Sequence, residues 1–109
     1  MSNIVEIGKE QFQTEVLQSK QPVLVDFYAT WCPPCRALAP TLDSIANEFA
    51  GRAKVVKINV DDAPELAADY GITSIPTLIF FKDGNIVESI VGAVSQRVLR
   101  SKLNSLVTA

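Results

Sequence analysis

The sequence predicts an α/β protein whose sheet mixes parallel and antiparallel strands. Three observations lead to this prediction. Short apolar runs alternate with segments of helical periodicity, the run Val23–Tyr28 is apolar on both faces, and Asp83-Gly84 separates two further apolar runs. Alternating strand and helix units favour parallel pairing, whereas an Asp-Gly turn favours an antiparallel hairpin. The expected order is β-α-β-α-β-α-β-β-α, with five strands and four helices.

The N-terminal part of the chain predicts a strand, a helix and a central strand. The first strand covers residues 5–7. Apolar residues at helical spacing predict a helix over residues 9–18, with an inner face of Phe12, Val16 and Leu17. The next strand, Val23–Tyr28, follows Gln21-Pro22 and is apolar on both sides of Asp26. Such a strand is typical of the covered centre of a sheet.

A second helix is predicted after the two cysteines, from apolar residues that recur at helical spacing: Leu38, Leu42, Ile45, Ala46 and Phe49. Pro40 lies within this pattern. Because the apolar stripe continues beyond Pro40, we expect this proline to kink the helix rather than end it. Gly51 fits the C-terminal cap of the helix.

The C-terminal half predicts three strands and two helices. One buried strand covers residues 55–60, and a short helix begins at Pro64 and ends at Gly71, since proline is favoured in a first helical turn. Strands over residues 77–81 and 86–91 flank the Asp83-Gly84 turn. Ser95 is expected to cap the last helix, whose predicted inner face consists of Val98, Leu99, Leu103 and Leu106.

The composition predicts a single globular domain over residues 1–109. Hydrophobic residues make up 48% and charged residues 20%, which excludes a disordered chain. The formal net charge of -2 argues against a nucleic-acid binder, which usually presents a basic face. No apolar run approaches the roughly 20 residues of a membrane helix. The N-terminus lacks a basic region followed by an apolar segment, so we expect no signal peptide and no membrane partner.

The chain contains two cysteines and no histidine. A structural zinc site needs about four ligands, mostly cysteine or histidine, so we expect no metal. The absence of histidine also excludes a Ser-His-Asp or Cys-His hydrolase. Acid–base chemistry is therefore left to aspartate, glutamate, lysine, tyrosine or cysteine itself.

Cys32 and Cys35 are separated by two residues, between a predicted strand and a predicted helix. As a structural disulfide, a ring of this size contributes only roughly 2 kcal/mol, so a reversible dithiol/disulfide pair is the stronger interpretation. At the cap position, a Cys32 thiolate would be stabilised by the unpaired amides of the first turn and by the helix dipole. Cys35 lies one turn further in. We expect it to be more buried, and to attack the mixed disulfide that Cys32 forms with a substrate.

The segment from Val25 to Cys35, VDFYATWCPPC, resembles the active-site segment of the thioredoxin family, as do residues 70–77 and 91–93. The match runs nearly end to end. The resemblance implies the thioredoxin fold, a central mixed five-stranded β-sheet flanked by four α-helices, with the cysteines at the start of the second helix. It also implies a cytoplasmic, monomeric protein-disulfide reductase without cofactors. Its partners would be disulfide-containing proteins and a thioredoxin reductase that recharges it.

Asp26 and Lys57 are candidates for proton transfer. Asp26 either faces water from an edge strand or is a buried carboxylate whose raised pKa suits it to accept the Cys35 proton, and its apolar neighbours favour the second interpretation. Lys57 lies in another buried strand, where its ammonium group could simply reach out to water. The resemblance implies instead that Lys57 lies near the buried carboxylate and tunes its pKa.

A substrate-binding surface is also implied by the resemblance. Ile75-Pro76 matches the cis-proline loop of the family, in which the Ile75 backbone pairs with an extended substrate and Pro76 covers the sulfurs. We interpret the single tryptophan as a residue of the rim, although it could belong to the core. Val60 could instead merely end a strand, and Gly92 could be a strand-end kink. The expected contact patch consists of Trp31, Pro34, Val60, Ile72, Ile75, Gly92 and Ala93.

The chain departs from the family at Pro33-Pro34, where thioredoxins usually have Gly-Pro. Pro33, in place of the usual glycine, removes one further amide near the sulfur, which should raise the thiol pKa. Pro-Pro also occurs in exported thioredoxin-like reductases of the cytochrome-maturation type, which are the first alternative function. A glutaredoxin-like enzyme fits less well because of the Trp31-Cys32 pair and the long β-α lead-in. A binding module without redox activity is an alternative of a different class.

Overall fold

The strand Val23–Tyr28 (β2) occupies the middle of a five-stranded sheet, as its two apolar faces predict. The computed structural model describes residues 3–108. The sheet has the order β1-β3-β2-β4-β5, in which β2 pairs parallel with β3 and antiparallel with β4. The other strands are Val5–Glu6 (β1), Lys54–Asn59 (β3), Thr77–Lys82 (β4) and Asn85–Val91 (β5). The predicted mixed α/β sheet is confirmed, with strand ends shifted by one residue in places.

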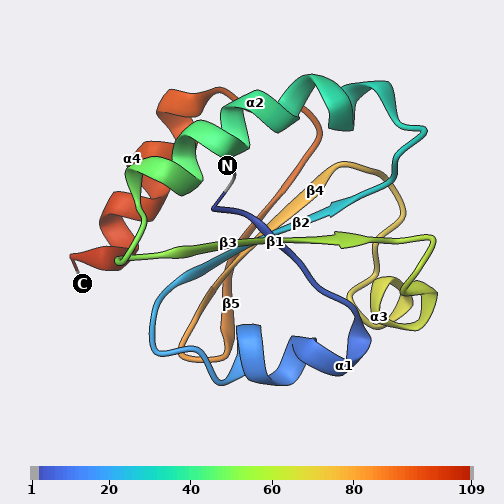
Figure 1. The fold of residues 1–109 in the computed structure, drawn as a ribbon, viewed down its shortest axis with the longest axis horizontal. Helices are drawn as coiled ribbons and strands as arrows, with labels where there is room; N and C mark the ends of the chain where they lie inside the picture. Colours follow the sequence, from blue (N-terminus) through green and yellow to red (C-terminus); the bar gives the residue numbers. More distant parts are fainter. Residues whose placement is uncertain (1–2, 109) are drawn as a thin grey trace.

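Helices cover both faces of the sheet (Figure 1). The helices Pro33–Glu48 (α2) and Gln96–Val107 (α4) lie on one face, over a core that includes Leu24, Leu78 and Phe80. The helix Lys9–Phe12 (α1), its continuation Gln13–Leu17 (η1) and the helix Pro64–Asp69 (α3) lie on the other face, over a second core that includes Phe27 and Phe81. Because both faces are covered, the even residues of β2 contact one layer and the odd residues the other.

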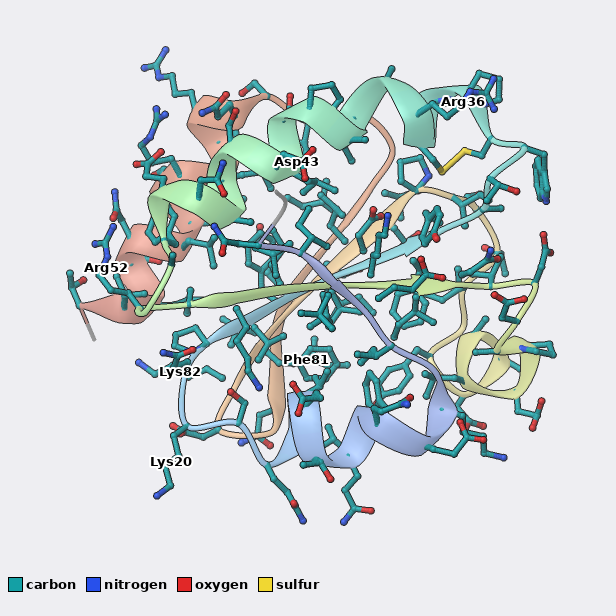
Figure 2. All side chains as sticks on the ribbon, viewed as in Figure 1. Lys20, Arg36, Asp43, Arg52, Phe81 and Lys82 are labelled. Carbon is teal, nitrogen blue, oxygen red and sulfur yellow. A yellow bond between two sulfur atoms is a disulfide. The ribbon has the colours of Figure 1, made fainter. Side chains whose placement is uncertain are left out.

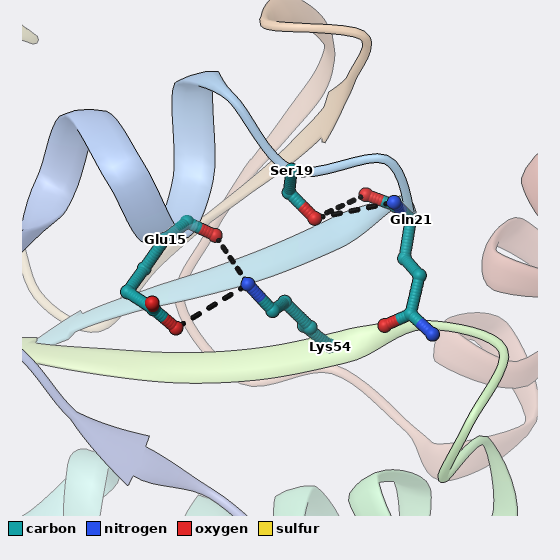
Figure 3. Close-up of polar contacts among 4 residues, drawn as sticks. All are labelled: Glu15, Ser19, Gln21 and Lys54. Atoms are coloured by element: carbon teal, nitrogen blue, oxygen red, sulfur yellow. Dashed lines mark hydrogen bonds and ion pairs between the residues drawn. The ribbon is translucent and has the colours of Figure 1, made fainter.

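The first helix differs from the uniform α-helix predicted over residues 9–18, because its second half is a π-helix in which the Gln18 amide donates to the Gln13 carbonyl at 2.9 Å. The Lys54 ammonium, at the start of β3, donates to the Glu15 carbonyl at 2.9 Å and to the Glu15 carboxylate at 3.3 Å (Figure 3). Just after the helix, the Ser19 hydroxyl donates to the Gln21 carbonyl and accepts from the Gln21 amide (Figure 3). The Glu15 carbonyl thus accepts from Lys54, a residue 39 positions away in sequence. Helical periodicity cannot reveal such a contact.

The helix α2 begins and ends close to the predicted positions. Cys32 is its N-cap, and the helix continues through Pro40 to Glu48, so the proline does not end it. Gly51 follows two residues after the C-cap Phe49 with a φ of 85°, a conformation that favours glycine. In α4, Ser95 is the N-cap and accepts a hydrogen bond from the Val98 amide at 3.2 Å, as predicted.

The predicted inner face of α4 is confirmed for Leu99, Leu103 and Leu106, all of which are buried, but it is wrong for Val98, which is 40% exposed. Val98 directly precedes Leu99 in the first turn of the helix. Successive residues of a helix are about 100° apart, so an apolar residue next to a core position can face water.

The hairpin between β4 and β5 turns at Asp83-Gly84, where both residues have positive φ values, 53° and 80°. This conformation fits the twist of two antiparallel strands and explains the Asp-Gly pair. The turn also lies against the end of η1, because a Cβ atom added to Gly84 would lie 2.8 Å from the Leu17 carbonyl oxygen.

We therefore expect Gly84→Ala to lower the free energy of unfolding by about 2–4 kcal/mol, through backbone strain and overlap with the Leu17 carbonyl. The matched control is Gly51→Ala, at a φ of 85° with no described atom within 4 Å of the added carbon. That control should cost about 1 kcal/mol. Urea unfolding at neutral pH measures both. Equal losses would show that the contact with Leu17 is unimportant.

Candidate active site

Cys32 and Cys35 lie at the N-terminal end of α2 and form a disulfide, with their Cα atoms 5.3 Å apart (Figure 2). The Cys35 amide donates to the Cys32 sulfur at 3.2 Å. Pro33 and Pro34 have no N–H group, so Cys35 provides the first amide of this helical turn. In the reduced protein, the same amide and the helix dipole would stabilise a thiolate on Cys32.

The expectation that Cys35 is the more buried cysteine is wrong for this disulfide form, since the two residues are 3% and 4% exposed. The reason is a distant loop. The Cys32 sulfur lies 3.8 Å from the carbonyl oxygen of Ile75, 43 residues further along the chain. Ala29 completes the buried cluster around the two sulfurs, and Val60 and Ile75 pack against it. Without this loop, Cys32 would be more exposed at the start of the helix.

Asp26 lies in the middle of β2 and is only 5% exposed, so the alternative of an edge-strand aspartate facing water is wrong. Its Oδ1 atom has no hydrogen-bond partner among the residues that the structure describes. Burial raises the pKa of this carboxyl to about 7, and the positive charge of Lys57 acts in the opposite direction. A carboxyl with this pKa can both take up and release a proton near neutral pH.

A cavity of about 410 Å³ lies between Asp26 and Cys35, and both residues line it. It lies on the α2 side of the sheet, where Lys57 and Tyr28 also contribute to its walls. Lys57 is the direct partner of Asp26 across the β2–β3 ladder. A cavity of this size, bordered by the Asp26 and Lys57 side chains, has room for water molecules that could carry a proton between Cys35 and Asp26.

The residues predicted to contact substrates surround the disulfide to different depths. Trp31 is 63% exposed, so the alternative of a core tryptophan is wrong. Its indole N–H donates to Asp61 Oδ2 at 2.7 Å, which holds the ring at the rim. Among the other residues, Pro34 and Ala93 are exposed, Val60, Ile72, Ile75 and Gly92 are half-buried, and Pro76 is buried.

The Ile75–Pro76 peptide bond is cis, as the resemblance implies. Two contacts bring this loop to its neighbours: the Ile75 carbonyl lies near the Cys32 sulfur, and the Pro76 carbonyl accepts from the Gly92 amide at 2.8 Å. Gly92 has a φ of 91°, so its position at the end of β5 does include a change of chain direction. The loop therefore joins the end of β5 on one side and lies beside the Cys32 sulfur on the other.

Sequence reasoning missed several residues that organise this site. Asp61 accepts from Trp31, and the Arg36 guanidinium donates to the Thr30 carbonyl at 2.8 Å. The Tyr28 hydroxyl donates to Glu6 Oε1 at 2.7 Å. For Tyr28 a signal existed, since it follows Asp26 by two residues in the same strand and shares its face. No comparable spacing along a strand or helix connects Asp61 or Arg36 with the site.

Within residues 3–108, which the structure describes, no helix is long and apolar enough to span a membrane. The same part of the chain contains no group of three or more histidine, cysteine, aspartate or glutamate side chains placed to bind a metal ion.

Comparison with known proteins identifies the family. The thioredoxin family model matches residues 3–105. A thioredoxin from Porphyra purpurea is 47% identical over 106 residues, which cover 97% of this chain and 99% of the relative. Thioredoxin 1 from Nostoc sp. is 50% identical over 94% of this chain and 96% of its own length. A thioredoxin from Haemophilus influenzae is 44% identical over 95% and 97%. With its cysteine pair joined at the start of α2, this chain belongs to the thioredoxin family and is a thiol–disulfide oxidoreductase.

Proposed function

We propose that this oxidoreductase reduces disulfide bonds of other proteins, with Cys32 as the attacking thiol and Cys35 as the resolving thiol. The observation that carries this assignment is the Cys35 amide, which donates to the Cys32 sulfur and would stabilise a thiolate there. The Cys32 thiolate attacks one sulfur of the substrate disulfide. A mixed disulfide forms, and the other substrate sulfur leaves as a thiolate that takes a proton from water.

The second half of the reaction uses Cys35 and Asp26. Cys35 loses its proton to Asp26 through the shared cavity, and its thiolate then attacks the Cys32 sulfur. The mixed disulfide breaks, the Cys32–Cys35 disulfide forms, and the second substrate sulfur leaves as a thiol after taking a proton. The substrate gains two electrons and the cysteine pair loses two. Lys57 keeps the pKa of Asp26 below the value that burial alone would give it, and so tunes the proton transfer from Cys35 to Asp26.

Substrates bind to the surface formed by the rim and the cis-proline loop. The Ile75 backbone pairs with an extended substrate segment, and Pro76 covers the sulfurs from the side of the loop. The apolar contacts come from Trp31, Pro34, Val60, Ile72, Gly92 and Ala93. The 63% exposure of Trp31, held by Asp61, is what an anchoring contact requires.

We also propose that the protein acts as a cytoplasmic monomer recharged by a thioredoxin reductase. A disulfide reductase that turns over needs an electron donor for its own disulfide, and family membership favours this donor. An exported reductase would instead draw electrons from another dithiol protein.

Insulin reduction in the presence of dithiothreitol tests the activity, and reduction by NADPH with thioredoxin reductase tests the electron donor. The wild-type protein should be active with both donors, and Cys32→Ser should be inactive with both. A binding module without redox activity would fail the dithiothreitol assay. Activity with dithiothreitol but not with the reductase would overturn the proposed donor and favour the exported type.

Pro33→Gly should lower the pKa of the Cys32 thiol and shift the reduction potential, while the fold and the basic activity persist. The reason is that glycine restores a backbone amide near the sulfur at the helix start. The pH dependence of Cys32 alkylation measures the thiol pKa.

Pro33→Ala is the matched control, since it restores the same amide without the flexibility of glycine. Equal shifts in the two variants would assign the effect to the amide. If the pH midpoint of Cys32 alkylation stays unchanged in both variants, the restored amide does not stabilise the Cys32 thiolate. Loss of folding would instead make Pro33 a structural residue.

A further inference from the structure

Glu6, Lys57 and Asp26 form a row of charged side chains across three neighbouring strands. Glu6 of β1 is the partner of Lys57 of β3, and Lys57 is the partner of Asp26 of β2. Partner residues in a sheet project from the same face. In strand order, the Lys57 ammonium therefore has a carboxylate on either side, the exposed Glu6 and the buried Asp26. Both carboxylates can therefore attract the same positive charge.

Tyr28 contacts two members of this row. It follows Asp26 by two residues in β2, so its side chain lies on the same face of the sheet. Its hydroxyl donates to Glu6 Oε1 at 2.7 Å, and the Lys57 Nζ atom lies 5.1 Å from the centre of its ring. The first contact holds the competing carboxylate, and the second holds the ammonium over the aromatic face.

We propose that Tyr28 is a positioning residue of the exchange reaction, which holds Glu6 by its hydroxyl and Lys57 by its ring so that the ammonium serves Asp26. The inference rests on the proposed function, in which Asp26 takes the proton of Cys35. The Tyr28 hydroxyl donates to Glu6 rather than to a cysteine, so we assign it no part in carrying the proton. Burial and the neighbouring carboxylates raise the pKa of its hydroxyl, which therefore stays protonated as a donor to Glu6.

Other charged side chains lie around the row of Glu6, Lys57 and Asp26. Arg36 and Asp43 of α2 line the same cavity as Asp26, Lys57 and Cys35, and the Arg36 guanidinium is held by the Thr30 carbonyl. Asp62, in the segment after β3, acts on Tyr28 electrostatically. None of these groups changes in the variants below, so differences between variants report the Glu6–Tyr28–Lys57 arrangement.

Two single substitutions should move the Asp26 titration in opposite directions. Tyr28→Phe keeps the ring and removes the hydroxyl, so Glu6 is released and draws the Lys57 ammonium away from Asp26. The Asp26 carboxyl should then titrate about half a pH unit higher. Glu6→Gln removes the competing charge, and Asp26 should titrate lower by a similar amount. In the double variant, Tyr28→Phe should add almost nothing to Glu6→Gln, since no competing carboxylate remains.

The experiment follows the Asp26 side-chain carboxyl by carbon-13 NMR as a function of pH in the disulfide form. The matched controls are Tyr70→Phe, which removes a hydroxyl on the opposite face of the sheet, and Glu10→Gln, which removes an exposed charge on α1. Opposite shifts for the two test variants, with no further shift in the double variant, would support the proposal. It is overturned if Tyr28→Phe moves the midpoint no more than Tyr70→Phe. It is also overturned if Tyr28→Phe has its full effect in the Glu6→Gln background.

Insulin turnover of the same variants across pH separates this proposal from the proposed function. If the turnover profile follows the Asp26 midpoint, both are supported. If the midpoint moves as expected but the profile stays in place, the role of Asp26 as proton acceptor is overturned, whereas the positioning of Lys57 by Tyr28 stands. Because the NMR titration needs no turnover, the two failures cannot be confused.

Discussion

Replacing Cys35 with serine is expected to stop the reaction at the mixed disulfide between Cys32 and a substrate. The attack on the substrate needs only Cys32 and the amide of residue 35, which serine retains. The release step needs a thiol held next to the Cys32 sulfur, and an intramolecular attack of this kind has a very high effective concentration. Turnover should therefore fall by roughly 10³-fold or more, with substrate proteins retained covalently.

Non-reducing gel electrophoresis after mixing with native, disulfide-bonded insulin measures the trapped species, and dithiothreitol should release it. The matched control is Cys32→Ser, which should trap no substrate because the attacking thiol is gone. Trapping by Cys32→Ser but not by Cys35→Ser would reverse the assignment of the two roles. Equal trapping by both variants would mean that the helix start does not select one thiol over the other.

The second large effect concerns Asp26, whose replacement by alanine should stabilise the protein above neutral pH. Burial raises the pKa of Asp26 to about 7, against about 3.9 in the unfolded chain. A carboxyl with a raised folded pKa contributes its full stability below pH 4. That contribution is lost as the pH rises to the folded pKa, because the unfolded chain ionises first. The loss is about 3–4 kcal/mol at pH 8.

Asp26→Ala should therefore raise the free energy of unfolding by about 3 kcal/mol at pH 8, and the gain should shrink as the pH falls toward 4. Urea unfolding of the disulfide form between pH 4 and 8 measures this dependence. Asp26→Asn is a control that keeps the shape of the side chain without its charge. Lys57→Met should act in the opposite direction, since it removes the charge that lowers the pKa of Asp26. A stability difference independent of pH would show that Asp26 does not ionise at a cost in the folded protein.

The same substitution should slow disulfide reduction, on the order of 10²-fold in the resolving step, because Cys35 loses its proton acceptor. Single-turnover reduction of a disulfide substrate separates this step from the initial attack by Cys32. An unchanged resolving rate in Asp26→Ala would mean that the Cys35 proton leaves by another route. A gain in stability together with a loss of rate is the combination expected for a buried functional carboxyl.

Much of the fold could be predicted from local patterns. The apolar faces of Val23–Tyr28 indicated the central strand, and Asp83-Gly84 indicated the hairpin, since a turn with two positive φ values has few sequence solutions. The spacing of Cys32 and Cys35 after a strand indicated both the N-cap of α2 and its redox chemistry. Each of these signals is local, because helical and strand periodicity and turn chemistry act over a few residues.

Other features were decided only by the tertiary structure. The Ile75 loop covers Cys32 from 43 residues away, and the Lys54 ammonium donates to the Glu15 carbonyl from 39 residues away. Lys57 stands opposite Asp26, and Glu6 opposite Lys57, because of the register of three strands. Periodicity tells which face of an element is buried, but not which residue of another element lies opposite. That pairing is set by how the layers pack as a whole, and the proton-transfer and positioning groups of this site depend on it.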